Sequence, residues 1–145
     1  MFFVLVKKIE TAMAIVFTYG SLMCADIMAA ITGVDLHSDV VVISNFARYA
    51  LRGQTFPAMV AEESARVEGR LYYDVDESAL ARLDVFEGDC YRRCTVSVKT
   101  SNGTDLRAQA YVLRDFYRSL LADWDWDFDH FLAHGKKDFT NRYLS

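Results

Sequence analysis

Two runs of alternating apolar and polar residues flank the dipeptide Asn102-Gly103. Asn-Gly between alternating runs is the strongest short-range signal of a β-hairpin, because both residues accept the backbone angles of a tight turn. The residues on one face of this hairpin are apolar: Cys94, Val96, Val98, Leu106, Ala108, Ala110 and Val112. Such a face must be buried, so the hairpin predicts a core built on antiparallel strands.

The rest of the chain predicts more strands than helices. Strands are indicated at 15–19, 40–50, 57–60 and 67–75, and in the last of these one face is expected to hold Val67, Gly69, Leu71, Tyr73 and Val75. A short helix is expected from Met23 to Ile31, closed by Gly33. These elements indicate an α+β fold with a small mixed sheet, twisted or closed, flanked by short helices.

Two further helical segments complete the prediction. Asp76 can cap a helix that ends at Gly88, with an apolar stripe of Leu80, Leu83 and Phe86. After Asp115 the pattern is helical again, with a stripe that Gly135 can cap, followed by aromatic residues that continue around the sheet: Trp124, Phe128, Phe131, Leu132, then Phe139 and Tyr143.

Length and charge limit the class of protein. The chain has 145 residues, one proline, no internal repeat and no linker, which predicts a single domain over residues 13–145. A net charge of −4 without a Lys/Arg cluster indicates neither a nucleic-acid nor an anionic-membrane partner, so a small-molecule ligand is expected, and the oligomeric state stays open.

The first twelve residues and the cysteines indicate where in the cell the protein is expected. Met1–Ala12 is apolar but interrupted by charges too early for a membrane span, and we interpret it as an N-terminal extension or an extra edge strand. Three cysteines, an odd number, make a disulfide framework improbable and favour a reducing, cytoplasmic protein.

The tetrapeptide Tyr19-Gly20-Ser21-Leu22 is one place where chemistry could occur. A strand that turns through glycine exposes successive backbone N–H groups, which can bind a carboxylate or an oxyanion. The alternative is an ordinary turn at the end of a strand.

Glu87 is the second place. It lies at the predicted C-terminus of a helix, where the macrodipole disfavours a carboxylate, and Asp84 adds a like charge one turn earlier. Both effects are expected to raise the pKa of Glu87, as a general base working near neutral pH requires. The alternative is a solvated surface glutamate.

Tyr91 and Arg93 follow Glu87 and share one face of a predicted strand. They could orient Glu87 or, in the case of Arg93, hold a substrate carboxylate through the guanidinium fork. Arg92 and Arg93 could equally be surface charges.

The sequence gives little support for a metal or cofactor site. Cys90 and Cys94 have no second cysteine pair, and His130 and His134 lie outside any HExxH pattern, so no metal site is expected. The nucleophile elbow of serine hydrolases, the phosphate-binding loop and the dinucleotide fingerprint are all missing from the sequence, and no cofactor is predicted.

Five segments in order, VFTYGSLM, RYALRGQTFPAMV, VEGRLYYDVD, LARLDVFEGDCYRR and AQAYVL, resemble the gamma-glutamylcyclotransferase-like family, in particular its branch with the plant avirulence-induced-gene proteins. The resemblance runs from Ile15 to about Leu113. It implies a small mixed β-barrel flanked by helices, with a cavity at one end. It also implies a cofactor-independent lyase, formally an acyltransferase, in which the α-amine of a gamma-glutamyl substrate attacks the γ-carbonyl and 5-oxoproline is released.

Site roles follow from the resemblance motif by motif. Tyr19, Gly20, Ser21 and Leu22 would bind the glutamyl group through backbone amides, Glu87 would be the catalytic acid/base, and Tyr91 matches the tyrosine that follows it. The segment CADIMAAITG after YGSLM lacks the basic and glycine residues that many cyclotransferases have there, so glutathione is not implied as the substrate.

A binding module is the alternative from another class: the same cavity holding a small carboxylate without turnover. Glu87 favours the enzyme, because a protein that only binds an anion gains nothing from a carboxylate in its pocket.

Overall fold

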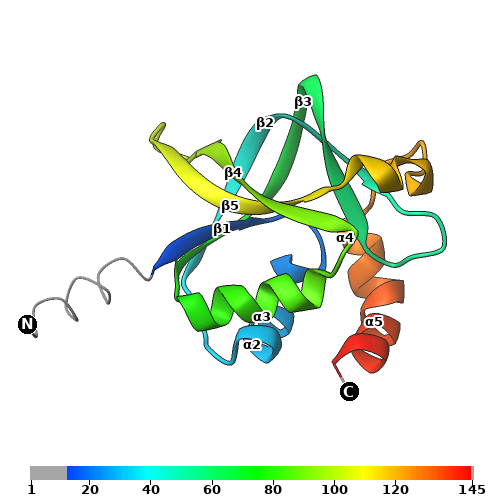
Figure 1. Ribbon diagram of the computed structural model, residues 1–145, viewed down its shortest axis with the longest axis horizontal. Helices are drawn as coiled ribbons and strands as arrows, with labels where there is room; N and C mark the ends of the chain where they lie inside the picture. The colour runs from blue at the N-terminus through cyan, green and yellow to red at the C-terminus, as the bar shows by residue number, and fades with distance from the viewer. Residues whose placement is uncertain (1–12, 145) are drawn as a thin grey trace, which may run out of the picture.

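Five strands form a closed barrel in the order β1-β3-β2-β4-β5 (Figure 1). The computed structural model describes residues 13–144, so the interpretation of Met1–Ala12 concerns residues outside the described part. The strands are β1 (Ala14–Thr18), β2 (Ser38–Ala50), β3 (Pro57–Val75), β4 (Tyr91–Lys99) and β5 (Asp105–Leu113). The β1–β5 pairing is parallel and the others are antiparallel, which confirms the predicted mixed, closed sheet.

The predicted hairpin is formed by β4 and β5, whose pairing runs from Tyr91 opposite Leu113 to Lys99 opposite Asp105. Gly103 has a φ of 86°, as the turn requires. The predicted apolar face points into the barrel, where it meets side chains of the other three strands in one buried cluster, including Phe17, Ile43, Val67, Leu71, Val96, Val98, Ala108 and Ala110.

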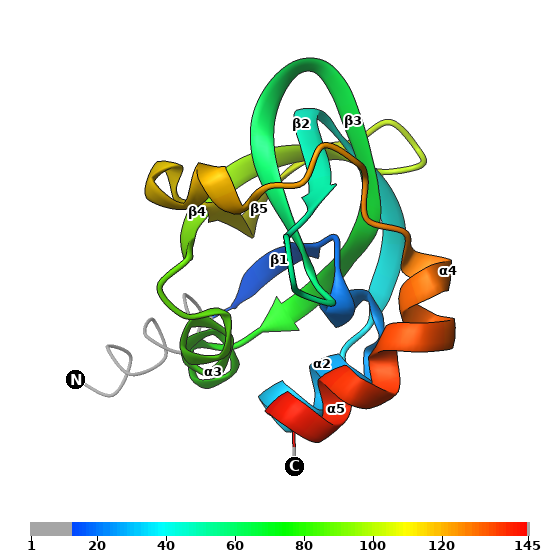
Figure 2. The same cartoon turned by 90° about the vertical axis from the view of Figure 1, so that its right-hand side faces the viewer.

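Helices cover one side and one end of the barrel (Figures 1 and 2). They are η1 (Ser21–Met23), α2 (Ala25–Thr32), α3 (Glu77–Glu87), η2 (Asp115–Leu120), α4 (Phe128–His130), η3 (Phe131–Gly135) and α5 (Lys136–Tyr143). A second buried cluster joins the outer face of the barrel to α2, α3 and α5 through residues such as Val16, Met28, Leu83, Phe131 and Phe139.

The helix boundaries follow local signals closely. The Asp76 carboxylate accepts a hydrogen bond from the Ala79 N–H at 2.8 Å, and Gly88, with a φ of 76°, ends α3. Gly33 ends α2 in the left-handed conformation, as predicted.

The strand β3 differs from the prediction of two separate strands. Residues 61–64 continue it, although all four are exposed: Ala61 pairs with Phe46 of β2, and the Ser64 N–H donates to the Asn45 side chain, where the register of the two strands shifts. A segment that is solvated on both faces shows no alternating pattern, so periodicity could not find it.

The predicted face of β3 is wrong at its last residue. Asp74 has a φ of 57°, and the register with β1 shifts between Ala14 and Val16. This bulge turns Val75 to the outer cluster, while Val67 and Leu71 stay inside the barrel.

The predicted C-terminal helix is also wrong in detail. Gly135 does not cap it, because helical structure runs on from Phe128 to Tyr143, and Trp124 and Leu132 are exposed. Gly135 is instead a contact position: a Cβ there would lie 3.1 Å from the ring of Phe131. No helix within residues 13–144 is long and apolar enough to cross a membrane.

Candidate active site

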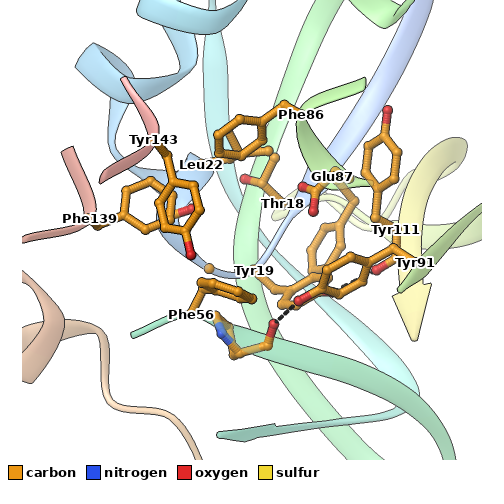
Figure 3. A pocket seen from close by; sticks show the side chains of 14 residues that line it. Thr18, Tyr19, Leu22, Phe56, Phe86, Glu87, Tyr91, Tyr111, Phe139 and Tyr143 are labelled. Carbon is orange, nitrogen blue, oxygen red and sulfur yellow. Dashed lines mark hydrogen bonds between the residues drawn. The ribbon is translucent and has the colours of Figure 1, made fainter. Parts of the chain in front are cut away.

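A cavity of about 150 Å³ lies where the end of β1, the C-terminus of α3 and helix α5 meet (Figure 3). Its size suits a ligand with about as many atoms as a small ring. Its lining comes from seven separate parts of the chain: Phe17–Leu22, Phe56 and Pro57, Phe86 and Glu87, Tyr91, Tyr111, Phe139 and Tyr143. Of the predicted site residues, Tyr19, Gly20, Ser21, Leu22, Glu87 and Tyr91 are among them.

The segment Tyr19–Leu22 forms one wall and is held by its carbonyl groups. The Leu22 carbonyl accepts a hydrogen bond from the Tyr72 hydroxyl at 2.7 Å, the Tyr19 carbonyl accepts one from Arg48 at 3.0 Å, and the Gly20 carbonyl accepts one from the Met23 N–H at 2.9 Å. The backbone N–H groups of residues 20–22 have no acceptor within the described part of the chain. The fold thus fixes this loop and leaves three successive donors free for a ligand.

Glu87 is the last residue of α3, and its carboxyl group lies in the cavity between Thr18 and Tyr111 (Figure 3). Burial raises the pKa of Glu87 from 4.5 to about 8. Among residues 13–144 no hydrogen bond or ion pair to this half-buried carboxyl group is found, so no protein group opposes the effect of burial on its pKa. Burial raises this pKa, whereas the sequence pattern predicted that the helix macrodipole and the Asp84 charge would raise it.

Three tyrosines surround Glu87, but their hydroxyl groups are engaged elsewhere. Tyr19 donates to the Tyr111 carbonyl at 2.6 Å, Tyr91 to the Pro57 carbonyl at 2.7 Å, and Tyr111 to the Asp84 carboxylate at 2.7 Å. Burial, reinforced by the nearby Glu87 charge, raises the pKa of each tyrosine. The tyrosines therefore stay protonated, and together they form a rigid frame around Glu87.

Arg93 is the one predicted binding residue that does not line the cavity. Its Nε lies 2.9 Å from an Asp84 carboxylate oxygen, and its Nη1 donates to the Gln109 side chain at 2.8 Å. Arg93 follows Tyr91 on the same strand face, but two residues along a strand span roughly 7 Å, which carries it past the cavity. Its guanidinium positions Asp84, which in turn accepts the Tyr111 hydroxyl.

Six aromatic lining residues were not predicted as site residues: Phe17, Phe56, Phe86, Tyr111, Phe139 and Tyr143. Phe139 and Tyr143 are four residues apart in α5, a spacing that places them on one helix face. That spacing predicts an apolar helix face, but it does not show which part of the protein the face packs against.

The cysteine and histidine pairs lie apart from this cavity. His130 and His134 are exposed, with ring centroids 4.8 Å apart, and all three cysteines are free thiols. The described residues contain no group of three or more His, Cys, Asp or Glu side chains arranged to hold a metal ion.

The cavity combines free backbone donors with an unpaired carboxyl group. The donors can bind an anionic group, and the carboxyl group, with a pKa near neutrality, can exchange a proton with a bound ligand. This combination fits chemistry on a small molecule that carries both a carboxylate and a titratable nitrogen.

Comparison with known proteins points the same way. Residues 16–128 match the family model described as gamma-glutamyl cyclotransferase, AIG2-like. Protein AIG2 C of Arabidopsis thaliana is 32% identical over 117 residues, which cover 77% of this chain and 69% of that protein.

Two solved structures share the fold. A solution structure of an Arabidopsis thaliana protein superposes with a TM-score of 0.71 at 26% identity, covering 90% of this chain and 79% of that one. A yeast gamma-glutamyl cyclotransferase described as specific to glutathione superposes with a TM-score of 0.62 at 14% identity, covering 77% and 73% of the two chains, a likeness of fold. On the family model and the sequence relatives together, this chain belongs to the AIG2-like gamma-glutamyl cyclotransferase family.

Proposed function

We propose that the protein releases 5-oxoproline from a gamma-glutamyl amine or peptide, with Glu87 as the general acid and base. The observation that carries the proposal is the Glu87 carboxyl group, which has no partner among the described residues, a pKa of about 8, and a place in the same cavity as the free N–H groups of residues 20–22. Family membership supports the reaction class.

The substrate would bind with its glutamyl carboxylate at the N–H groups of residues 20–22. Its α-ammonium group would then lie beside Glu87. A positive charge at that distance favours the carboxylate over the carboxylic acid, so substrate binding itself lowers the pKa of Glu87 and prepares the base.

Glu87 then takes one proton from the α-ammonium group. With a pKa of about 8 in the empty cavity, Glu87 is much closer in basicity to an amine, whose ordinary pKa is about 8, than a solvated carboxylate is. The proton transfer is correspondingly less uphill.

The neutral α-amine attacks the γ-carbonyl carbon, which forms the ring C–N bond. Glu87 returns its proton to the nitrogen of the leaving amine, and the γ-carbon–nitrogen bond of the substrate breaks. The ring nitrogen, which still carries one proton in excess, gives that proton to Glu87, and Glu87 passes it to the released amine. The products are 5-oxoproline and an ammonium ion, and Glu87 is again a carboxylate. Because the nucleophile belongs to the substrate, the protein contributes positioning and proton transfer.

The test is a turnover assay on a panel of gamma-glutamyl amines and dipeptides, with 5-oxoproline as the measured product. Glu87→Gln keeps the shape of the side chain but cannot accept a proton, so turnover should fall roughly 10²–10⁴-fold. Asp84→Asn is the matched control: it removes a neighbouring carboxylate that is engaged with Arg93 and Tyr111, and most of the activity should remain.

Near-full activity of Glu87→Gln, or an inactive Asp84→Asn with an active Glu87→Gln, would contradict the proposal. Binding of 5-oxoproline by the wild type without turnover of any compound in the panel would favour the binding-module alternative.

A further inference from the structure

One side of the cavity is aromatic. Phe56, Phe86, Phe139 and Tyr143, here called the aromatic wall, pack on one another with ring centroids 4.9–6.2 Å apart. In Figure 3, Phe139 and Tyr143 lie on one side of the cavity, and Tyr91 and Tyr111 lie on the other beside Glu87. The amine half of a substrate whose amide nitrogen lies at Glu87 would therefore extend along the aromatic wall toward the surface, where Tyr143 is 45% exposed.

Half of the aromatic wall lies beyond the family match. The match ends at residue 128, whereas Phe139 and Tyr143 belong to α5 (Lys136–Tyr143). The wall is thus specified in part by residues of this chain that are not among those matched by the family model.

The cavity offers no positive charge. None of its described lining residues is a lysine or an arginine. Three cationic side chains on the elements that form it are engaged with other groups: Arg82 with the Thr32 carbonyl at 2.9 Å, Arg93 with Asp84 at 2.9 Å, and Arg142 with Asp138 at 3.1 Å. A carboxylate on the amine half of the substrate would lose hydration without gaining a counter-ion, and it would lie in the same cavity as Glu87.

From these observations we infer that the leaving half of the substrate is an uncharged hydrophobic amine, alkyl or aryl, rather than an amino acid or a dipeptide with a free carboxylate. The inference rests on the proposed function and adds the substrate class. Aromatic rings at these spacings offer apolar area and edge-to-face contacts to such a group.

The test compares kcat/KM for gamma-glutamyl benzylamide and isobutylamide with that for gamma-glutamylglycine and for a gamma-glutamyl diamine. The hydrophobic amides should be preferred at least about 10-fold, the order of selectivity that one or two buried methylene groups provide. Equal or higher kcat/KM for the acidic or the cationic substrate would overturn the inference while leaving the proposed reaction intact. Turnover of none of the four would overturn the proposed function itself.

Tyr143→Arg tests the location of the leaving half. Tyr143 is 45% exposed at the end of α5, so the substitution is compatible with folding. It should raise kcat/KM for gamma-glutamylglycine relative to the benzylamide about 10-fold, because it supplies the missing counter-ion. The affinity for 5-oxoproline, which carries only the glutamyl half, should stay within about 2-fold.

Phe116→Arg is the matched control, since it adds the same charge at an exposed aromatic residue that does not line the cavity. It should leave the substrate ratio unchanged. If Tyr143→Arg also leaves the ratio unchanged, or if Phe116→Arg shifts it equally, the leaving half does not contact the aromatic wall.

Discussion

The barrel interior and the cavity beside it are both lined mainly by apolar and aromatic side chains, but they differ in how their polar groups are used. Inside the barrel, β-branched and small residues from all five strands close on one another, and the strand backbones are paired around the ring. In the cavity, three backbone N–H groups and the Glu87 carboxyl group are without protein partners among the described residues. The first region uses its hydrogen-bonding capacity for the fold, and the second has polar groups without protein partners, which we propose a ligand meets.

This difference separates stability from function. A folded domain rarely leaves polar groups unmet away from bulk water, because each one costs free energy. The cost is tolerated where a ligand supplies the partners. Substitutions in the barrel should therefore act on the free energy of unfolding, and substitutions in the cavity should act on binding and turnover.

Gly69→Ala should have the largest effect on folding. A Cβ at Gly69 would lie 2.2 Å from the Thr18 carbonyl oxygen and 2.6 Å from the Phe17 ring, at the pairing of β1 with β3. Because the backbone of β1 cannot move away without breaking that pairing, we expect a loss of about 3 kcal/mol or more in the free energy of unfolding. Urea denaturation measures this loss. A loss below about 1 kcal/mol in the free energy of unfolding would show that the barrel backbone shifts to accommodate the added methyl group.

Glu87→Gln should stabilise the protein in a pH-dependent way. The pKa is 4.5 for an unperturbed glutamate and about 8 in the fold, so the unfolded chain ionises first and wild-type stability falls as the pH rises from about 4.5 to 8. The glutamine does not ionise, so the variant should exceed the wild type by roughly 1–3 kcal/mol at pH 9 and match it near pH 4.

Urea denaturation at pH 4, 6 and 9 measures this difference, with Glu68→Gln as the control because Glu68 is exposed on β3. A constant difference between Glu87→Gln and the wild type across this range would show that burial does not raise the pKa of Glu87.

Gly20→Ala should have the smallest effect on stability but a measurable one on binding. A Cβ at Gly20 would lie 2.7 Å from the ring of Pro57, so the segment Tyr19–Leu22 must shift away from Pro57. The affinity for 5-oxoproline should fall about 5–10-fold, corresponding to about 1 kcal/mol. Calorimetric titration measures it. Gly53→Ala is the control: Gly53 lies outside the cavity lining and alanine is strained at its φ of 76°, so a loss of affinity caused by general destabilisation would appear there too. Unchanged affinity would mean that the ligand does not use this loop.

Much of the fold could be predicted from local patterns. The β4–β5 hairpin follows from Asn102-Gly103 and the alternation around it, and α3 follows from Asp76 and Gly88 at its ends. The prediction fails where local patterns are overridden. The Asp74 bulge reversed the face of Val75, and Gly135 lies within helical structure, where a Cβ would make a tight contact of 3.1 Å with the Phe131 ring.

Part of the site could also be predicted from local sequence patterns. Residues 19–22 and Glu87 stand out because each ends a regular element, where backbone groups or a charge become available. Arg93 was expected at the cavity because it shares a strand face with Tyr91, but its partners, Asp84 on α3 and Gln109 on β5, hold it outside the lining.

What the sequence determined by itself, then, is the set of elements, their ends and the two short motifs, because turns, caps and alternation act between residues a few positions apart. Only the tertiary structure decided that Glu87 loses its hydration and faces an aromatic wall. That environment is assembled from residues near positions 20, 56, 86, 91, 111 and 140, brought together by barrel closure and the docking of α5. Burial is a property of such long-range contacts, so no local pattern around Glu87 could state its pKa.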